Sequence, residues 1–184
     1  MIVFLDFEAS SLSKTSYPIE IGWVFEDGQT ASFMIKPAPD WTDWSDEAEQ
    51  IHKISRAMLA AEGVEVNVVA TAMIEALQGH TLYASAPSWD GKWLSVLLRS
   101  AGYPRHALRL VDSERAFQEA AREILGLNAP EDQIEELVTQ CMQNKELSQP
   151  VHRALADAKA EHACWLQVRS AGLALRESNR SRDD

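Results

Sequence analysis

The feature that most constrains the fold is an apolar run at the start of the chain that ends in two acidic residues. Residues 2–5 read Ile-Val-Phe-Leu, a run typical of a strand that is buried on both faces. Asp6 and Glu8 follow, and residues two apart on a strand point to the same face, with Cα atoms about 6.5 Å apart. Two carboxylates placed in this way repel each other unless a cation lies between them, and a divalent metal ion suits them. Taken alone, the pair fits equally well a strand that ends in solvent.

Length and composition indicate one globular domain. The chain has 184 residues, of which 46% are hydrophobic and 24% charged, enough for a single full core. No apolar run reaches the length of a membrane span, and no basic segment precedes the first apolar run. We therefore expect no signal peptide, no membrane association and a cytoplasmic location. Cys141 and Cys164 stand apart within helical patterns, which predicts reduced, partly buried thiols.

The formal net charge of −11 limits the ways in which the protein can contact nucleic acid. Proteins that clamp long duplexes usually present a basic face, and this chain has no run of Lys or Arg. Any contact with nucleic acid should be short, metal-assisted and local. An acidic chain is also compatible with no nucleic acid binding at all.

The hydrophobic pattern favours an α/β fold, with a mixed sheet of five strands covered by helices. An Asp-Gly turn at residues 27–28 predicts an antiparallel hairpin beside the first strand. We expect one domain over residues 1–176 and a disordered polar tail over 177–184. The predicted strands are the run at 2–5 with its acid pair, 19–25, 30–36, 81–85 and 108–111. The predicted helices are a short one capped by Ser55, then 66–77, 90–101, 114–125, 130–144 and 154–175.

Two segments carry less information. Residues 40–50 are acidic, and a run of charges predicts a solvated face. Residues 127–149 contain no diagnostic motif; we expect either a lid over a site or a subunit contact. A homodimer is therefore among the assemblies that the sequence allows.

Further residues capable of chemistry lie later in the chain. Asp90 follows Trp89 at the start of a predicted helix, where an acid is also explained by the helix dipole. His152 and Asp157 lie at the start of the last predicted helix, so that both can point toward one spot. Each residue has an ordinary structural explanation when it is taken singly.

Their joint occurrence changes the interpretation. An acid pair on a core strand, an acid after another strand and a His with an Asp on a late helix would form one carboxylate-rich centre. Two metal ions about 3.5–4 Å apart need several shared carboxylates to hold them. A neutral histidine beside such a centre suits a general base, because its ordinary pKa is about 6.5. This combination suits the hydrolysis of a phosphodiester.

The same residues resemble the DEDDh group of 3′-to-5′ exonucleases, a DnaQ-like family with a ribonuclease H-like fold. The resemblance covers about residues 1–172. The Asp-x-Glu motif matches residues 6–8, the aromatic-Asp motif matches 89–90, and the His-x4-Asp motif matches 152–157. Lesser similarities are Ile-Glu-Ile-Gly at 19–22, Ile-Lys-Pro at 35–37 and Ile-His-Lys-Ile at 51–54.

The resemblance implies a role for each site residue. His152 would accept a proton from the attacking water, and the products would be nucleoside 5′-monophosphates. The loop from Ala9 through Ser10 and Ser11 to Leu12 would receive the terminal nucleotide, with Leu12 against the last base. This loop departs from the family pattern, which often reads Thr-Thr-Gly-Leu. Two Mg²⁺ or Mn²⁺ ions would be held by Asp6, Glu8, Asp90 and Asp157.

The leading interpretation is thus a metal-dependent 3′-to-5′ exonuclease that acts on single-stranded DNA or RNA ends. A phosphohydrolase that acts on nucleotides or very short oligonucleotides is the first alternative, and the acidic composition favours short substrates. A non-catalytic interaction domain of the same fold is the second alternative. The set of like charges argues against it, because a binding module has no need to keep them together.

Overall fold

The structure is a computed structural model that describes residues 1–126, 128–146 and 152–183. Within this part of the chain, six strands form one sheet in the order β4-β3-β2-β1-β5-β6. The strands are β1 (Ile2–Ala9), β2 (Pro18–Phe25), β3 (Thr30–Lys36), β4 (Val64–Glu65), β5 (Thr81–Ala84) and β6 (Leu110–Asp112). The helices are α1 (Asp46–His52), α2 (Arg56–Glu62), α3 (Val66–Leu77), α4 (Pro87–Ser100), α5 (Ser113–Leu125), α6 (Glu131–Glu146) and α7 (Ala154–Asp183).

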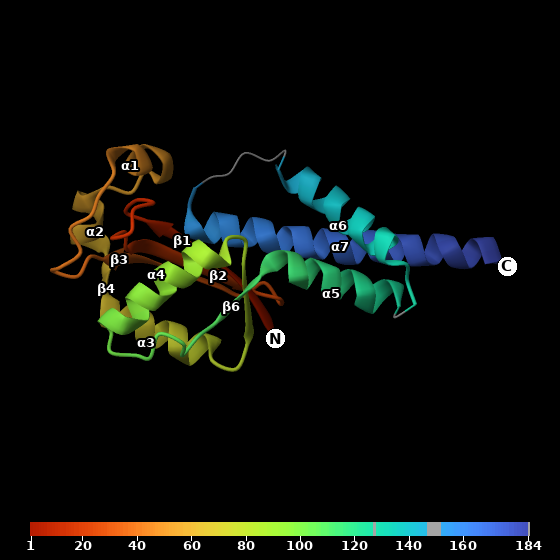
Figure 1. Cartoon of the computed structure of the whole chain (residues 1–184), viewed down its shortest axis with the longest axis horizontal. Helices are drawn as coiled ribbons and strands as arrows, with labels where there is room; N and C mark the ends of the chain where they lie inside the picture. The colour runs from red at the N-terminus through yellow and green to blue at the C-terminus, as the bar shows by residue number, and fades with distance from the viewer. Residues whose placement is uncertain (127, 147–151, 184) are drawn as a thin grey trace.

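The sheet is mixed, as the sequence predicts, and β1 lies near its centre (Figure 1). β1 pairs antiparallel with β2 on one side and parallel with β5 on the other. β2 and β3 form the antiparallel hairpin expected from the Asp-Gly turn, whose Gly28 has a φ of 89°. The prediction of five strands is wrong by one. β4 is only two residues long, too short to leave an alternating pattern, and it pairs parallel with the end of β3.

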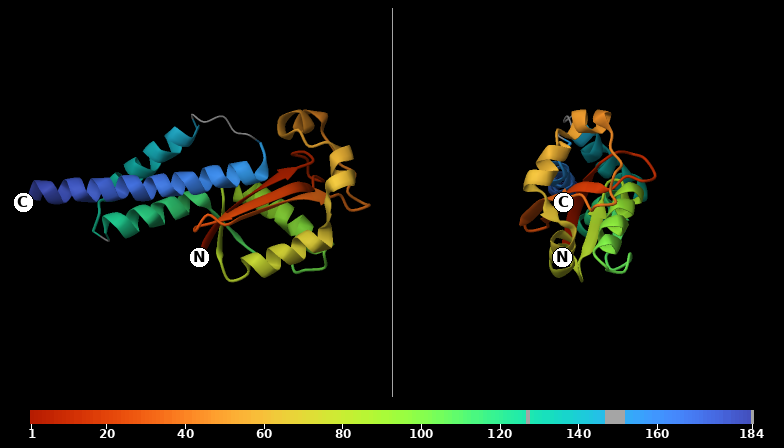
Figure 2. Two further views of the ribbon diagram at one scale, coloured as in Figure 1. Left: turned by 180° about the vertical axis from the view of Figure 1, so that it is seen from behind. Right: turned by 90° about the vertical axis from the view of Figure 1, so that its left-hand side faces the viewer.

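Each face of the sheet is covered by its own helices (Figures 1 and 2). Successive side chains of a strand point to opposite faces, so β1 contributes to two cores. Val3, Leu5 and Phe7 belong to one core, which includes buried residues of α3 and α4. Phe4 belongs to the other core, with buried residues of α5, α6 and α7. Asp6 shares the face of Phe4, and its side chain therefore points toward α7 rather than into solvent.

Two further expectations about the elements change. Part of the acidic segment 40–50 forms α1, in which Ser45 caps the N-terminus by accepting a hydrogen bond from Ala48 N–H. Residues 177–183, for which the sequence predicts a disordered tail, continue α7. α6 covers most of the segment 127–149, but residues 127 and 147–149 lie outside the described part, and the role of the segment as a lid or subunit contact stays a prediction.

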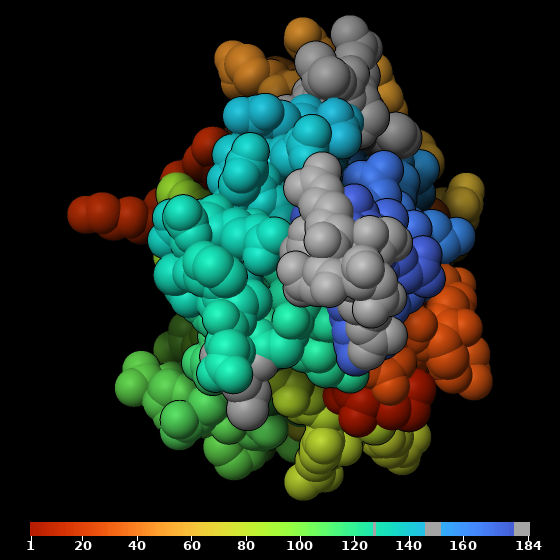
Figure 3. Space-filling model, turned by 90° about the vertical axis from the view of Figure 1, so that its right-hand side faces the viewer, coloured from red at the N-terminus to blue at the C-terminus, as the bar shows by residue number. Residues whose placement is uncertain are grey.

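The end of the molecule toward which α7 runs is built by α5, α6 and α7. Helices α5 and α6 form much of the surface seen there (Figure 3). Cys141 on α6 and Cys164 on α7 are free thiols, and both are buried rather than partly buried as expected. Among the described residues, no helix combines the length and the apolar character needed to cross a membrane.

Candidate active site

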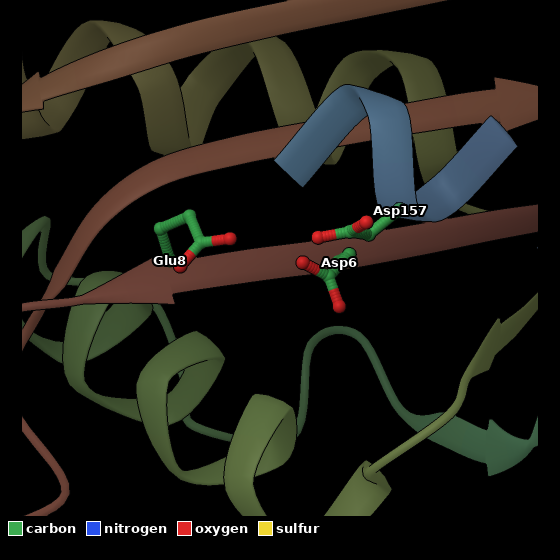
Figure 4. A group of neighbouring side chains, drawn as sticks. All are labelled: Asp6, Glu8 and Asp157. Atoms are coloured by element: carbon green, nitrogen blue, oxygen red, sulfur yellow. The ribbon is translucent and has the colours of Figure 1, made fainter. Parts of the chain in front are cut away.

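Three of the predicted acids meet at the end of β1. Asp6 and Glu8 project from the strand, and Asp157 reaches them from the first turn of α7 (Figure 4). One carboxylate oxygen from each of the three lies within 4.8 Å of the others. Asp6 and Asp157 are 151 positions apart in the sequence, so this cluster depends on where α7 lies on the sheet.

Gly22 on β2 allows α7 to lie that close. Gly22 is the register partner of Asp6, and a Cβ at Gly22 would stand 2.3 Å from the backbone nitrogen of Leu155. Any side chain at this position would therefore push the first turn of α7 away from the sheet. Ala154 and Ala158 on α7 are fully buried, and their small side chains suit the same close approach.

Glu20 fixes the N-terminus of α7 from the sheet side. Its carboxylate is 2% exposed and accepts hydrogen bonds from Arg153 Nη2 at 2.6 Å and Nε at 3.0 Å. It also accepts one from the Ala154 N–H at 3.0 Å, which satisfies a backbone donor at the start of the helix. Both oxygens of the Glu20 carboxylate are thus engaged by the residues that start α7.

Asp90, the fourth predicted ligand, lies beside β1 but is not part of the group of three clustered carboxylates. The pairing of β1 with β5 ends at Phe4, so the Phe7 N–H has no strand partner there. Asp90 Oδ1 accepts a hydrogen bond from that N–H at 3.2 Å. The side chain is 2% exposed, and its Oδ2 has no hydrogen-bond partner. A buried carboxylate oxygen without a partner is unfavourable unless a proton or a cation satisfies it.

The pKa values of these carboxyls reflect their burial and crowding. Burial, followed by the charges of Asp90, Glu8 and Asp157, raises the pKa of Asp6 well above its usual range. Burial and the charge of Asp157 raise the pKa of Glu8 to about 8, although Arg153 opposes the shift. Burial raises the pKa of Asp90 to about 7, against the lowering effect of its backbone hydrogen bonds. A bound cation would reverse these shifts, because it favours the charged carboxylates.

Sequence reasoning missed one buried acid in this region. Glu161 lies one turn after Asp157 on the buried face of α7 and is 3% exposed. Its Oε1 forms an ion pair with Lys145 of α6, while its Oε2 is buried without a partner. The signal was its spacing, because positions 154, 158, 161, 165 and 168 define one helix face that is otherwise apolar.

His152 immediately precedes α7 and is partly buried. Its φ is 51°, in the left-handed region that few non-glycine residues adopt. The neighbouring Arg153 is held by Glu20, so the backbone on the helix side of His152 is anchored to β2. The role of His152 as a base stays a prediction.

The loop after Glu8 is ordered by hydroxyl groups. The register of β1 and β2 shifts between Glu8 and Ala9, where the loop begins. Ser10 is fully buried, whereas Leu12 is 72% exposed. Asp43, from the segment between β3 and α1, accepts hydrogen bonds from hydroxyl groups of the loop, among them those of Ser10 and Ser11. Sequence reasoning placed Asp43 on a solvated face and missed this contact, because only the fold brings the segment to the loop.

The described residues fit a divalent metal ion. Hard cations such as Mg²⁺ and Mn²⁺ prefer oxygen ligands, and three carboxylate oxygens already lie together. The unpartnered Oδ2 of Asp90 adds a buried acceptor close to β1. The raised pKa values of Asp6, Glu8 and Asp90 mean that the charged carboxylates are unfavourable there without a cation.

Comparison with solved structures identifies the fold. An exonuclease I from Methylocaldum szegediense matches with a TM-score of 0.66 and 17% identity, over 94% of this chain and 41% of that one. A zinc-bound E. coli exonuclease I complex with single-stranded DNA matches with a TM-score of 0.65 and 17% identity, over 92% of this chain and 40% of that one. A complex of the E. coli enzyme with a dA16 oligonucleotide matches with a TM-score of 0.64 and 18% identity, over 94% and 42%.

Sequence comparison adds no closer relative. No protein-family model matches the chain, and no curated protein matches it. The chain spans about two fifths of the length of the exonuclease I chains. Over nearly its whole length, the chain has the fold of the exonuclease I structures, which agrees with the mixed α/β fold expected from its sequence.

Proposed function

We propose that the chain is a divalent-metal-dependent 3′-to-5′ exonuclease that releases nucleoside 5′-monophosphates from single-stranded DNA. The observation that carries the proposal is the meeting of Asp6, Glu8 and Asp157 within 4.8 Å at the end of a core strand. The shared fold supports it, because the exonuclease I structures include complexes with single-stranded oligonucleotides. RNA is the less supported substrate, because the nucleic acids named in these complexes are DNA.

We assign the binding of two Mg²⁺ or Mn²⁺ ions to the four carboxylates of Asp6, Glu8, Asp90 and Asp157. The ions, when bound, supply Lewis acidity that stabilises the negative charge developing on the phosphate. The protein prepares their site in two ways. β1 fixes the Asp6–Glu8 pair on one face, and the hydrogen bond from Phe7 N–H turns Asp90 so that its Oδ2 stays available.

His152 acts as the general base in this proposal. Its imidazole accepts the proton of the water that attacks the terminal phosphodiester. Glu20 and Arg153 orient it indirectly, because their ion pair and the hydrogen bond from Ala154 N–H hold the first turn of α7 against β2. The same turn carries Asp157, so one anchor positions both the base and a metal ligand.

The terminal nucleotide is placed against the loop from Ala9 to Leu12. Leu12 is 72% exposed, and this apolar side chain is free to pack against the last base. The net charge of −11 disfavours a long electrostatic track for the strand. We therefore expect affinity to depend on the metal ions and on the last few nucleotides rather than on strand length.

A degradation assay tests the proposal. A 5′-labelled single strand with Mg²⁺ or Mn²⁺ should give a ladder of products shortened one nucleotide at a time, together with nucleoside 5′-monophosphates. Asp6→Asn and Asp157→Asn should abolish the ladder, and calorimetric titration with Mn²⁺ should show weakened binding. Asp40→Asn is the matched control, because Asp40 is an exposed acid outside the site and loses the same charge.

The same assay separates the alternatives. Hydrolysis restricted to mononucleotides or dinucleotides would replace the exonuclease by the phosphohydrolase. No hydrolysis of any strand with either metal would overturn the enzymatic proposal and leave the interaction domain. Matched DNA and RNA strands decide the sugar preference. The cytoplasmic location and the homodimer stay predictions from the sequence.

A further inference from the structure

The hydroxyl groups of the loop after β1 converge on a single carboxylate. Asp43 Oδ2 accepts hydrogen bonds from Ser10 Oγ at 2.9 Å and from Ser11 Oγ at 2.6 Å. Asp43 Oδ1 accepts hydrogen bonds from Ser13 Oγ at 2.7 Å and from Thr15 Oγ1 at 3.3 Å. Four donors from six consecutive positions thus surround one side chain, which comes from the segment between β3 and α1.

The loop backbone is fixed from the same direction and from α4. Ser10 C=O accepts a hydrogen bond from Ser45 N–H at 2.9 Å, two residues beyond Asp43. Ser13 N–H donates to Ser11 Oγ at 2.9 Å, so the hydroxyl bonded to Asp43 also closes a turn of the loop. Lys92 Nζ of α4 donates a hydrogen bond to the carbonyl oxygen of Ser13. The loop is therefore bonded both to the segment that carries Asp43 and to the helix that carries Asp90.

These contacts determine where Leu12 points. Its neighbour Ser11 is tied inward to Asp43, and so is Ser13 on the other side. Leu12 lies between two tethered residues and projects outward, 72% exposed. Leu12 is also the most exposed of the large hydrophobic residues in the described part of the chain, and its side chain is therefore accessible to a ligand. None of the residues from Ala9 to Leu12 has a positive φ, so the loop adopts this conformation without a glycine.

We propose that Asp43 is a positioning residue for the terminal nucleotide. By binding four hydroxyls, Asp43 holds the loop from Ala9 to Leu12 in its binding conformation, so that the last base meets Leu12. Asp43 is not one of the three clustered carboxylates, and in this proposal it acts on the strand only through the loop. This inference rests on the proposed function, because the ligand of the loop is the 3′ end of the strand that the site cleaves.

Steady-state kinetics on a 5′-labelled oligothymidylate test the inference. Asp43→Ala should raise KM by about tenfold while kcat stays within about twofold, because the strand must then order the loop when it binds. A second substrate lacks the base of its 3′-terminal nucleotide. The wild-type protein should prefer the complete strand in kcat/KM, and Asp43→Ala should lose that preference, a loss that general destabilisation does not produce.

Two further variants keep the test decisive. Asp40→Asn, three residues away and exposed, removes the same charge and should leave KM and the base preference unchanged. Asp43→Asn keeps one carbonyl acceptor in nearly the same shape, so it should fold like the wild type with an intermediate KM. If Asp43→Ala does not fold, Asp43→Asn carries the comparison.

The possible failures are distinct. An active wild type whose KM and base preference survive in both Asp43 variants would overturn the inference and leave the exonuclease intact. A fall in kcat matching the rise in KM, together with early thermal unfolding, would make Asp43 a purely structural residue and overturn it as well. A wild type that degrades no strand would overturn the proposed function first.

Discussion

Glu20 and Arg153 are 133 residues apart in the sequence and form a two-pronged ion pair between β2 and the start of α7. The two N–O distances are 3.0 and 2.6 Å, and the carboxylate is almost completely buried. Glu20 is also the register partner of Glu8, so a guanidinium lies where two neighbouring acids would otherwise repel each other. The pair thus joins the sheet, the helix and the carboxylate centre.

Glu20→Gln should reduce both stability and activity. The variant leaves Arg153 without its charged partner and weakens the hydrogen bond to Ala154 N–H, so we expect a loss of about 1–3 kcal/mol in the free energy of unfolding. Urea denaturation measures this loss, and initial rates should fall because the first turn of α7 is less well placed. Glu65→Gln is the control: its ion pair with Lys36 is exposed, and its removal should cost less than about 1 kcal/mol. Equal costs for the two variants would contradict the anchoring role of Glu20.

Gly22→Ala should separate α7 from the sheet. Its Cβ would lie 2.3 Å from Leu155 N, and the obstacle is backbone, which cannot rotate away. We expect the variant to lose about 1–3 kcal/mol of stability by overpacking and to bind Mn²⁺ more weakly, because Asp157 moves with the helix.

Gly91→Ala is the matched control for stability. Apart from its chain neighbours and the backbone of its own helix, no atom would lie within 4 Å of the new Cβ, and alanine in a helix should stabilise the protein by about 0.4–1 kcal/mol. Unchanged Mn²⁺ affinity in a folded Gly22→Ala would show that the centre does not depend on this approach.

The first strand shows how much of the site could be predicted from the sequence. The buried run and the spacing of Asp6 and Glu8 predict their common face, because a strand repeats every two residues. The ordered motifs then associate Asp90 and Asp157 with them. A spacing rule of this kind predicts which residues share a face within one strand or helix. The order of motifs along the chain is needed to associate residues of different elements.

Contacts between distant segments were beyond prediction. Asp43 belongs to an acidic run that looks solvated, and only the placement of that run beside the loop reveals four hydroxyl partners. Glu161 looks like an ordinary helix acid until the packing of α6 buries it against Lys145. Such pairs leave no local periodicity, because the two partners lie on different elements and are joined only by tertiary packing.

His152→Asn should separate the chemical role of His152 from its backbone role. Asparagine adopts positive φ values readily, so it should accept the φ of 51° without loss of stability. Its amide cannot take up a proton at neutral pH, and turnover should fall by at least about a hundredfold if the imidazole is the base. Thermal unfolding and Mn²⁺ titration should match those of the wild type. Weakened Mn²⁺ binding would instead identify the imidazole as a metal ligand.

The stability of the metal-free protein should fall as the pH rises from about 6.5 to 8. Burial raises the pKa of Asp90 to about 7 and that of Glu8 to about 8, so the folded chain holds protons that the unfolded chain has released. Deprotonation then costs folding free energy. Below pH 6.5 the lowered pKa of buried His52 acts in the opposite direction, which sets the lower limit of the window.

With EDTA, the melting temperature should therefore decrease across this range, whereas Mg²⁺ should raise it most at the upper end, because the ion binds the charged carboxylates. Asp6→Asn should weaken this response to Mg²⁺ and Asp40→Asn should preserve it; a melting temperature in EDTA that rises between pH 6.5 and 8 would mean that the buried carboxyls ionise at no cost to folding.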